Sequence, residues 1–230
     1  MNEAVILRVK KLGHWRVNLR PLAAPSKKLT LPECQEAVEQ SAVSIRGWDF
    51  PHIARANSPT GGIERTADYV GTWTDWSGMI EFWRMYRSSQ FLSYVALRED
   101  TRPEGHDSPD EPVLNFLSAL YSITEFFEFA NRLGSHGLLP DGVRVSISLL
   151  NSKGRRLVAG RGRIPLFEDY RMSDDAAVLL EELDRNALLE KHREAAVRAS
   201  LELFNIFGWN PAASQLAAEQ QNFYDRKFGY

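Results

Sequence analysis

Residues 46–52 bring an acid, a base and an aromatic ring close together in the sequence. Asp49 and His52 lie three residues apart, and Gly47 and Trp48 precede them. A carboxylate near an imidazole can orient it for proton transfer, so the pair would suit a hydrolase site at the end of a strand. The same residues also suit a turn, with a bulge, a core ring and a capping carboxylate. Catalysis, ligand or partner contact and a purely structural role all remain open.

Glu128 is the second candidate for proton transfer. At helical spacing it falls on a mostly apolar side of its segment. A carboxylate left unpaired there would carry a large desolvation cost or take up a proton. We therefore expect an ion pair with Arg132 one turn on, or with Arg46 or Arg84 from the sheet. This structural pair is favoured over a general acid.

The sequence predicts neither a metal site nor a cofactor. The five histidines are scattered, and no H-x-x-x-H, H-E-x-x-H or H-x-D pattern occurs among them. Residues 160–163 resemble a phosphate loop only superficially, because they lack its Lys-Ser/Thr pair, and are interpreted as a turn. The single cysteine, Cys34, excludes an internal disulfide and suits a reducing cytoplasm.

Two basic segments could contact phosphates. Residues 1–30 carry seven Lys/Arg against one acid, residues 144–163 carry six with no acid, and residues 99–128 carry eight acids against one arginine. This asymmetry predicts a basic and an acidic side, as solvated surface, a nucleic-acid contact or the contact for an acidic protein. The second segment is predicted to form a hairpin over residues 143–163. Its candidate nucleic-acid or phosphate contacts are Arg144, Lys153, Arg155, Arg156, Arg161 and Arg163.

Aromatic and arginine side chains of the central region could form a binding surface. The chain is 11% aromatic and contains six tryptophans. Rings of residues 73–86 could stack on a single-stranded nucleic acid, although alternation would turn half of them into the core. Trp, Tyr and Arg also carry much of the binding energy of protein interfaces. The candidate partner contacts are Arg46, Trp48, Trp76, Arg84 and Arg87.

The elements that position these residues predict an α+β fold. Residues 67–98 alternate apolar and polar in three pieces with short separators, which indicates an antiparallel meander. Residues 109–133 predict an apolar core helix that begins at a capping box of Ser108 and Glu111 and ends at Gly134. We expect the meander to pack on this helix. The helix keeps one narrow polar stripe, made of Asn115, Ser118, Ser122 and Glu125.

The remaining segments complete one α+β domain over residues 1–230. Strands lie mainly within residues 1–98, and C-terminal helices occupy residues 184–225. The other expected elements are a bulged strand or short hairpin at 5–19, a short helix at 31–39, a strand in the first half of 42–53, a loop at 54–65, and a strand or helix at 176–183.

Composition is that of a folded globular chain. With 43% hydrophobic and 25% charged residues, the 230-residue chain can build a substantial core. No apolar run approaches the roughly 18 residues of a membrane span. The N-terminus has no apolar signal-peptide region. We therefore expect a cytoplasmic protein without a membrane partner.

Six segments together resemble an uncharacterised bacterial domain. They are SIRGWDFPHI at 44–53, EFWRMYRSSQF at 81–91, ITEFFEFANRL at 123–133, GRRLVAG at 154–160, PLFEDY at 165–170 and LELFNIFGW at 201–209. The resembled domain usually follows a Schlafen-type, Alba-like domain associated with DNA or ATP binding, and no catalytic residue is assigned to it. The resemblance spans about Trp15 to Trp209 and implies a stand-alone version, whose catalytic or DNA-handling component another protein would supply.

Three functions follow from these observations. The favoured one is a non-catalytic recognition or adaptor subunit of a bacterial multi-protein system, such as anti-phage defence, with another protein of that system as its partner. The alternative is a nucleic-acid-binding module that uses the basic hairpin. The weaker alternative is a hydrolase that uses Asp49 and His52.

Overall fold

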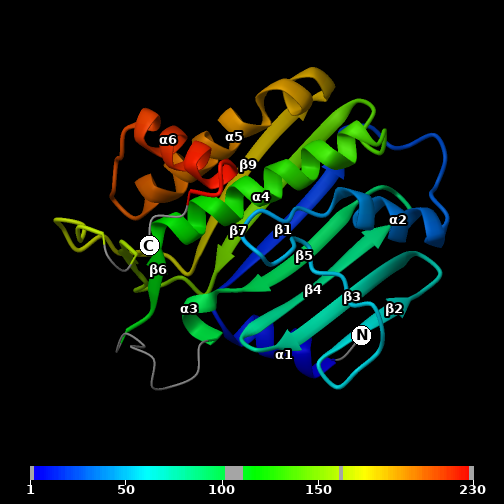
Figure 1. The fold of residues 1–230 in the computed structure, drawn as a ribbon, viewed down its shortest axis with the longest axis horizontal. Coiled ribbons are helices and arrows are strands. Elements are labelled where there is room, and N and C mark those ends of the chain that lie inside the picture. The colour runs from blue at the N-terminus through cyan, green and yellow to red at the C-terminus, as the bar shows by residue number, and fades with distance from the viewer. Residues whose placement is uncertain (1–2, 102–110, 161–162, 228–230) are drawn as a thin grey trace.

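A seven-stranded antiparallel sheet forms the centre of the fold (Figure 1). The structure is a computed structural model, and it describes residues 3–101, 111–160 and 163–227. The strand order is β2-β3-β4-β5-β1-β7-β9. These strands are β1 (His14–Pro21), β2 (Gly61–Arg65), β3 (Tyr69–Trp76), β4 (Met79–Tyr86), β5 (Phe91–Ala96), β7 (Gly142–Leu150) and β9 (Ala176–Asp184).

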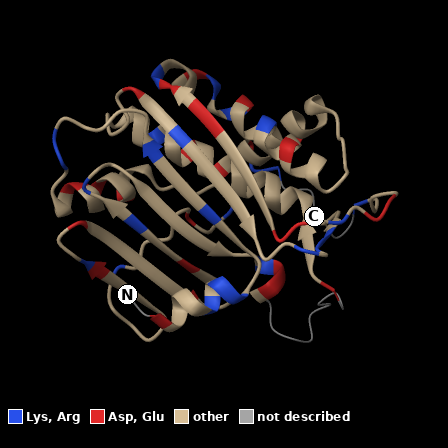
Figure 2. Ribbon diagram, turned by 180° about the vertical axis from the view of Figure 1, so that it is seen from behind, with Lys and Arg blue, Asp and Glu red and all other residues tan. Residues whose placement is uncertain are grey.

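Helices cover the two faces of the sheet unequally. On one face α4 packs on β7, α5 on β9 and β7, and α2 on β3 and β4, while α6 lies against α4 and α5. On the other face α1 lies against β3, β4 and β5. Figure 2 shows the molecule from behind, with this face toward the viewer. The helices are α1 (Glu3–Lys11), α2 (Leu31–Ser41), α3 (Arg98–Thr101), α4 (Phe116–Ser135), α5 (Arg185–Ile206) and α6 (Ala213–Tyr224). The predicted α+β class, with an antiparallel sheet and C-terminal helices, is confirmed.

The predicted central helix exists as α4, but it begins later than expected. Residues 102–110, which include the expected cap Ser108, lie outside the described residues. Among the described residues the helix begins at Phe116, because the Asn115 side chain accepts hydrogen bonds from the backbone N–H groups of Leu117 and Ser118. The three residues before it form strand β6 (Val113–Asn115).

The predicted end of this helix at Gly134 is also wrong. Gly134 is helical, and α4 continues to Ser135. A Cβ at this position would lie 2.7 Å from Cδ2 of Leu188 on α5. Glycine is therefore needed for the close approach of α4 and α5 and not as a helix stop.

The meander is confirmed as β3, β4 and β5. Tyr69 pairs with Tyr86 and Trp76 with Met79, so β3 and β4 are joined by the two-residue turn Ser77-Gly78. Both turn residues have positive φ, as a tight hairpin between twisted strands requires. β4 in turn pairs with β5.

The N-terminal prediction is wrong in its first half. Residues 5–19 were expected as a bulged strand or hairpin, but α1 precedes β1. Val5 and Val9 are one helical turn apart and both pack in a cluster with Ile80 and Phe82 on the outer face of the sheet, while Leu7 is exposed. Val5, Leu7 and Val9 fit either period in sequence, and packing on the sheet selects the helical one.

Residues 42–60 form no strand. The expected strand is reduced to a single bridge between Val43 and Phe50, around a turn at Gly47. The following residues, expected as a loop up to residue 65, instead contribute the edge strand β2, which pairs with β3. The helix expected at 31–39 is confirmed as α2, and Thr30 and Glu33 form its capping box.

The predicted basic hairpin over residues 143–163 is wrong. β7 lies inside the large sheet between β1 and β9. The next strand, β8 (Arg156–Val158), pairs in parallel with β6 instead of turning back on β7. Residues 176–183, ambiguous in sequence, form β9, and the C-terminal helices are confirmed with Asp184 as the N-cap of α5.

Replacing Phe127 with alanine should lower the free energy of unfolding by about 3 to 5 kcal/mol. Its ring is 1% exposed in the core around α4. Urea denaturation measures the loss. Phe167, which is 96% exposed, provides the control, and Phe167→Ala should stay within about 0.5 kcal/mol of wild type. Equal effects of the two substitutions would contradict the central position of α4.

Candidate functional site

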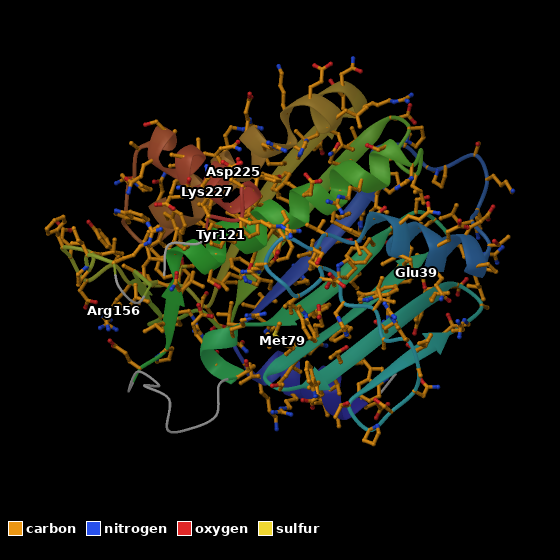
Figure 3. The ribbon with its side chains drawn as sticks, in the orientation of Figure 1. Glu39, Met79, Tyr121, Arg156, Asp225 and Lys227 are labelled. Carbon is orange, nitrogen blue, oxygen red and sulfur yellow. The ribbon has the colours of Figure 1, made fainter. Side chains whose placement is uncertain are left out.

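A small cavity lies where the first half of α4 meets one end of β4 and β5. Its volume is about 50 Å³. Trp48, from the loop between α2 and β2, lines it together with residues of the sheet and the helix. Met79, at the start of β4 near α3, is one of the lining residues and is labelled in Figure 3. The charged and hydroxyl-bearing lining residues are Arg46, Asp49, Glu81, Arg98, Glu99, Ser118, Ser122 and Glu125.

Two buried carboxyl groups line this cavity from opposite layers of the fold. Glu81 is 3% exposed and comes from β4, and Glu125 is 2% exposed and comes from α4. Strand alternation places Glu81 on the same face as Trp83 and Met85, which are fully buried. Glu125 belongs to the polar stripe of α4, so packing α4 on the sheet encloses it as well.

Hydrogen bonds from the 42–60 loop stabilise both carboxyl groups. Trp48 Nε1 donates to Glu81 Oε1 at 2.9 Å, and the backbone N–H of His52 also donates to Glu81. Arg46 Nη2 donates to Glu125 Oε2 at 2.7 Å and to Ser122 Oγ at 3.0 Å. The other oxygen of Glu125, Oε1, is buried and has no hydrogen-bond partner among the described residues. The site therefore holds an unused acceptor.

Burial controls the protonation of this carboxyl pair. It raises the pKa of Glu81 to about 7, against the weaker opposing effect of hydrogen bonds from Trp48 and His52, and the nearby Glu125 raises it further. Burial also raises the pKa of Glu125, although the charge and hydrogen bond of Arg46 oppose the shift. Near neutral pH a proton therefore resides on Glu81 for part of the time.

A ladder of three rings stands beside the cavity. Trp48 stacks on His52 at 4.1 Å and on Trp76 at 5.9 Å between ring centroids. Trp76 is 56% exposed. Trp48 and Trp76 also line two open hollows of about 240 and 280 Å³, one with Arg98 and the other with His52. This surface has the exposed aromatic groups and the concave shape of a binding site.

Asp49 and His52, the candidate hydrolase pair, both lie at this site, but their observed contacts differ from those expected of a catalytic pair. Asp49 is exposed and lines the cavity. The His52 ring is stacked on Trp48, and burial lowers its pKa while the charge of Asp49 opposes the shift. The structure thus uses His52 as one ring of the ladder and its backbone N–H as a donor to Glu81.

Glu128 is paired as expected, on the other side of α4. Arg132 Nε lies 3.0 Å from its Oε1, while His192 Nε2 and the Tyr224 hydroxyl lie 3.1 and 3.2 Å from its Oε2. Burial alone would raise the pKa of Glu128, but the hydrogen bonds of His192 and Arg132 outweigh it and lower the pKa to about 2. Glu128 therefore joins α4 to α5 and α6 as a charged anchor.

The predicted partner contacts fall into two separate groups. Arg46, Trp48 and Trp76 meet at the cavity. Arg84 lies further along β4, with its guanidinium 4.7 Å from the Tyr69 ring, and Arg87 donates to the backbone carbonyl of Leu29 beyond the far end of the strand. At about 3.3 Å per strand residue, Arg87 is roughly 25 Å along the chain direction from Met79. One surface does not contain all five residues.

The predicted phosphate contacts are mostly engaged with acids. Arg155 is 2% exposed and forms a two-pronged ion pair with Asp100, so it is not available to a phosphate. The others are placed as follows: Arg144 pairs with Glu182, Arg156 with Glu111 and Arg163 with Glu219, Lys153 is exposed, and Arg161 lies outside the described residues. Local ion pairs thus offset the basic charge of this segment.

The sequence contains a signal for each of the two buried glutamates. Glu81 alternates in register with Trp83 and Met85, so a core-facing strand of this kind must bury a carboxylate. Glu125 sits in the polar stripe of an otherwise apolar helix, where a buried polar group needs a partner. What the sequence could not show is that the two positions face each other.

Comparisons with known proteins do not identify the site. No family model matches the chain, and neither a curated protein nor a solved structure matches it. The resemblance to the Schlafen-associated domain therefore stays an expectation. Within the described ranges there is no group of three or more His, Cys, Asp or Glu that could hold a metal ion. No helix in the described part of the chain is both long and apolar enough to cross a membrane.

Glu81→Gln should flatten the pH dependence of stability. Between the ordinary pKa of 4.5 and the folded value of about 7, the folded state keeps a proton that the unfolded state has lost, so stability falls as pH rises. The full loss is about 3 kcal/mol. Urea denaturation from pH 5 to pH 8 measures the slope. Glu190→Gln, at an exposed position on α5, should keep the wild-type slope, and an unchanged slope in Glu81→Gln would contradict the assignment.

Arg155→Ala should destabilise the fold by about 3 to 5 kcal/mol, because Asp100 would be left without its buried partner. Lys153→Ala, two residues away and exposed, should change stability by less than about 0.5 kcal/mol. Thermal and urea unfolding of the two variants test the structural role. If Arg155→Ala unfolded like wild type, the arginine would be free for another role.

Proposed function

We propose that the protein is a non-catalytic recognition subunit that docks on another protein through the Trp48–Trp76 surface. The ring ladder is the observation that carries this proposal. Trp76 remains 56% exposed although it stacks on Trp48, and hollows flank the pair on both sides. An exposed, preorganised tryptophan next to concave surface is the kind of group that supplies interface energy once a partner covers it.

The resemblance found in the sequence supports the same proposal. It would place the protein in the bacterial cytoplasm, as an adaptor in a multi-protein system such as anti-phage defence. The buried thiol of Cys34, whose pKa burial raises to about 11, suits a reducing compartment because it needs no disulfide partner. The partner would be another protein of that system.

The two alternatives have less support. Nucleic-acid binding by residues 143–163 is less supported because Arg155 is buried and cannot reach a phosphate. Three further arginines of this segment are paired with glutamates. Hydrolysis gains from the raised pKa of Glu81, which suits a general acid. The candidate base His52, however, has its ring stacked on Trp48 at 4.1 Å, as part of the ring ladder.

Trp76→Ala should weaken partner binding by about 30-fold or more, as expected for an interface hot spot. The tagged protein would first be used to capture its partner from the native host, and the two purified proteins would then be titrated by calorimetry. Because Trp76 is largely exposed, the variant should melt within a few degrees of wild type. Leu180→Ala, at an exposed apolar position on β9, is the matched control and should bind normally.

Enzyme assays on the isolated chain complete this test. Nuclease, phosphatase and nucleotide-hydrolysis activities should be absent from purified wild type. If the purified chain hydrolyses one of these substrates, and Asp49→Ala or His52→Ala abolishes that activity, the docking function is wrong and the hydrolase alternative replaces it.

A further inference from the structure

The cavity lined by Glu81 and Glu125 has more negative than positive groups. Four acids line it, namely Asp49, Glu81, Glu99 and Glu125, against the two arginines Arg46 and Arg98. The formal charge of the wall is therefore negative when all of these groups are ionised. Opposite charge on a partner is the complement that such a wall would select.

The unused acceptor in this wall requires a donor. Arg46 occupies Oε2 of Glu125, but the buried Oε1 has no hydrogen-bond partner among the described residues. A buried acceptor without a donor is costly. Any group that completes the site must therefore bring an N–H or O–H, and a cationic donor would satisfy the charge of the wall as well.

The size of the cavity and its aromatic side limit which donor group can bind there. The cavity is small, about 50 Å³, and therefore favours a compact polar group over a wide one. A primary ammonium is compact, whereas a guanidinium is a wider plane with five donors. Trp48 presents its indole edge to the cavity, since its Nε1 donates to Glu81, and a methylene chain can lie beside that edge. Asp49 and Arg98 are exposed at the cavity and provide its side toward solvent.

We propose that the cavity receives a lysine side chain of the partner protein, whose ammonium group donates to Glu125 and Glu81 while its stem lies against Trp48. This inference rests on the proposed docking function and names the group that the docking site recognises. Arg46 binds only Oε2 of Glu125 at 2.7 Å, so Oε1 remains available to a second donor. The stacked Trp76 would cover the stem on the outside.

Protonation of the site gives this recognition a pH dependence. The raised pKa of Glu81, about 7, means that this carboxyl takes up a proton as the pH falls below neutrality. Glu125, Asp49, Glu99, Arg46 and Arg98 are the other charged groups that line the cavity. An ammonium ion binds the ionised carboxylate and competes with that proton, so binding should weaken up to about tenfold for each pH unit below 7.

The test uses the whole protein and n-butylammonium as a probe for the head and stem of lysine. At pH 8, millimolar n-butylammonium should shift the carboxyl carbon resonances of Glu81 and Glu125 and lower the apparent pKa of Glu81. Neutral n-butanol should not compete, n-propylguanidinium should bind at least tenfold more weakly, and binding should weaken at pH 5.5. Equal shifts with n-butanol, stronger binding of the guanidinium, or no shift at 100 mM probe would overturn the proposal.

Variants and a modified partner separate this inference from the docking function. Glu125→Gln should lose at least tenfold in n-butylammonium affinity, while Glu202→Gln, at an exposed position on α5, should bind like wild type. Circular dichroism confirms folding, and the wild-type resonances test the proposal independently of the variants. If lysine-acetylated partner still binds in a Trp76-dependent manner, the lysine inference fails and the docking function stands. If Trp76→Ala binds the partner as tightly as wild type, the docking function fails. The n-butylammonium titration still tests whether the cavity binds an ammonium group.

Discussion

Enclosure of α4 between the sheet and three other helices is the constraint on which the rest of the structure depends. The helix packs on β7 and against α2, α5 and α6, and 15 of its 20 residues are buried. A helix enclosed to this degree cannot leave its polar positions in water. Its buried polar side chains therefore require partners within the protein, since an isolated carboxylate in the interior carries a large desolvation cost.

Two glutamates of α4 meet this demand in different ways. Glu128 is bound by Arg132, His192 and Tyr224, and the ion pair thereby joins α4 to the C-terminal helices. Glu125 receives one arginine on one oxygen, and the other oxygen is left over. The first arrangement is complete and serves stability. The second is incomplete, and the free oxygen is the acceptor that the proposed lysine would use.

The loop over residues 42–60 is positioned by the same requirement. It has almost no regular secondary structure, yet Arg46 reaches Glu125 and Trp48 reaches Glu81, so two buried carboxyl groups fix its course over the sheet. With Trp48 fixed, Trp76 gains a ring on which to stack at the β3–β4 turn. The exposed ring ladder thus depends on polar contacts in the interior.

The sequence by itself determined the elements whose signals are local. The meander follows from alternation with short turns, α2 from its capping box, and the apolar character of α4 from its periodicity, because each depends on neighbours within a few residues. Local patterns were misleading where two periods fit, as in α1, or where the cap lies later than the expected one, as at Asn115. They also gave a false hairpin, because two neighbouring strand-like segments within residues 143–163 contain no information on which strand β8 pairs with.

Only the tertiary structure decided the site. Glu81 and Glu125 are 44 positions apart in the sequence, and nothing local requires that they share one cavity. The exposure of each arginine was likewise undetermined, since Arg155 and Lys153 look alike in sequence and differ because only Arg155 meets Asp100. Charge pairing, desolvation and ring stacking act through space between segments that folding brings together. The residue types therefore limited what chemistry was available, and the packing of α4 on the sheet determined where it is found.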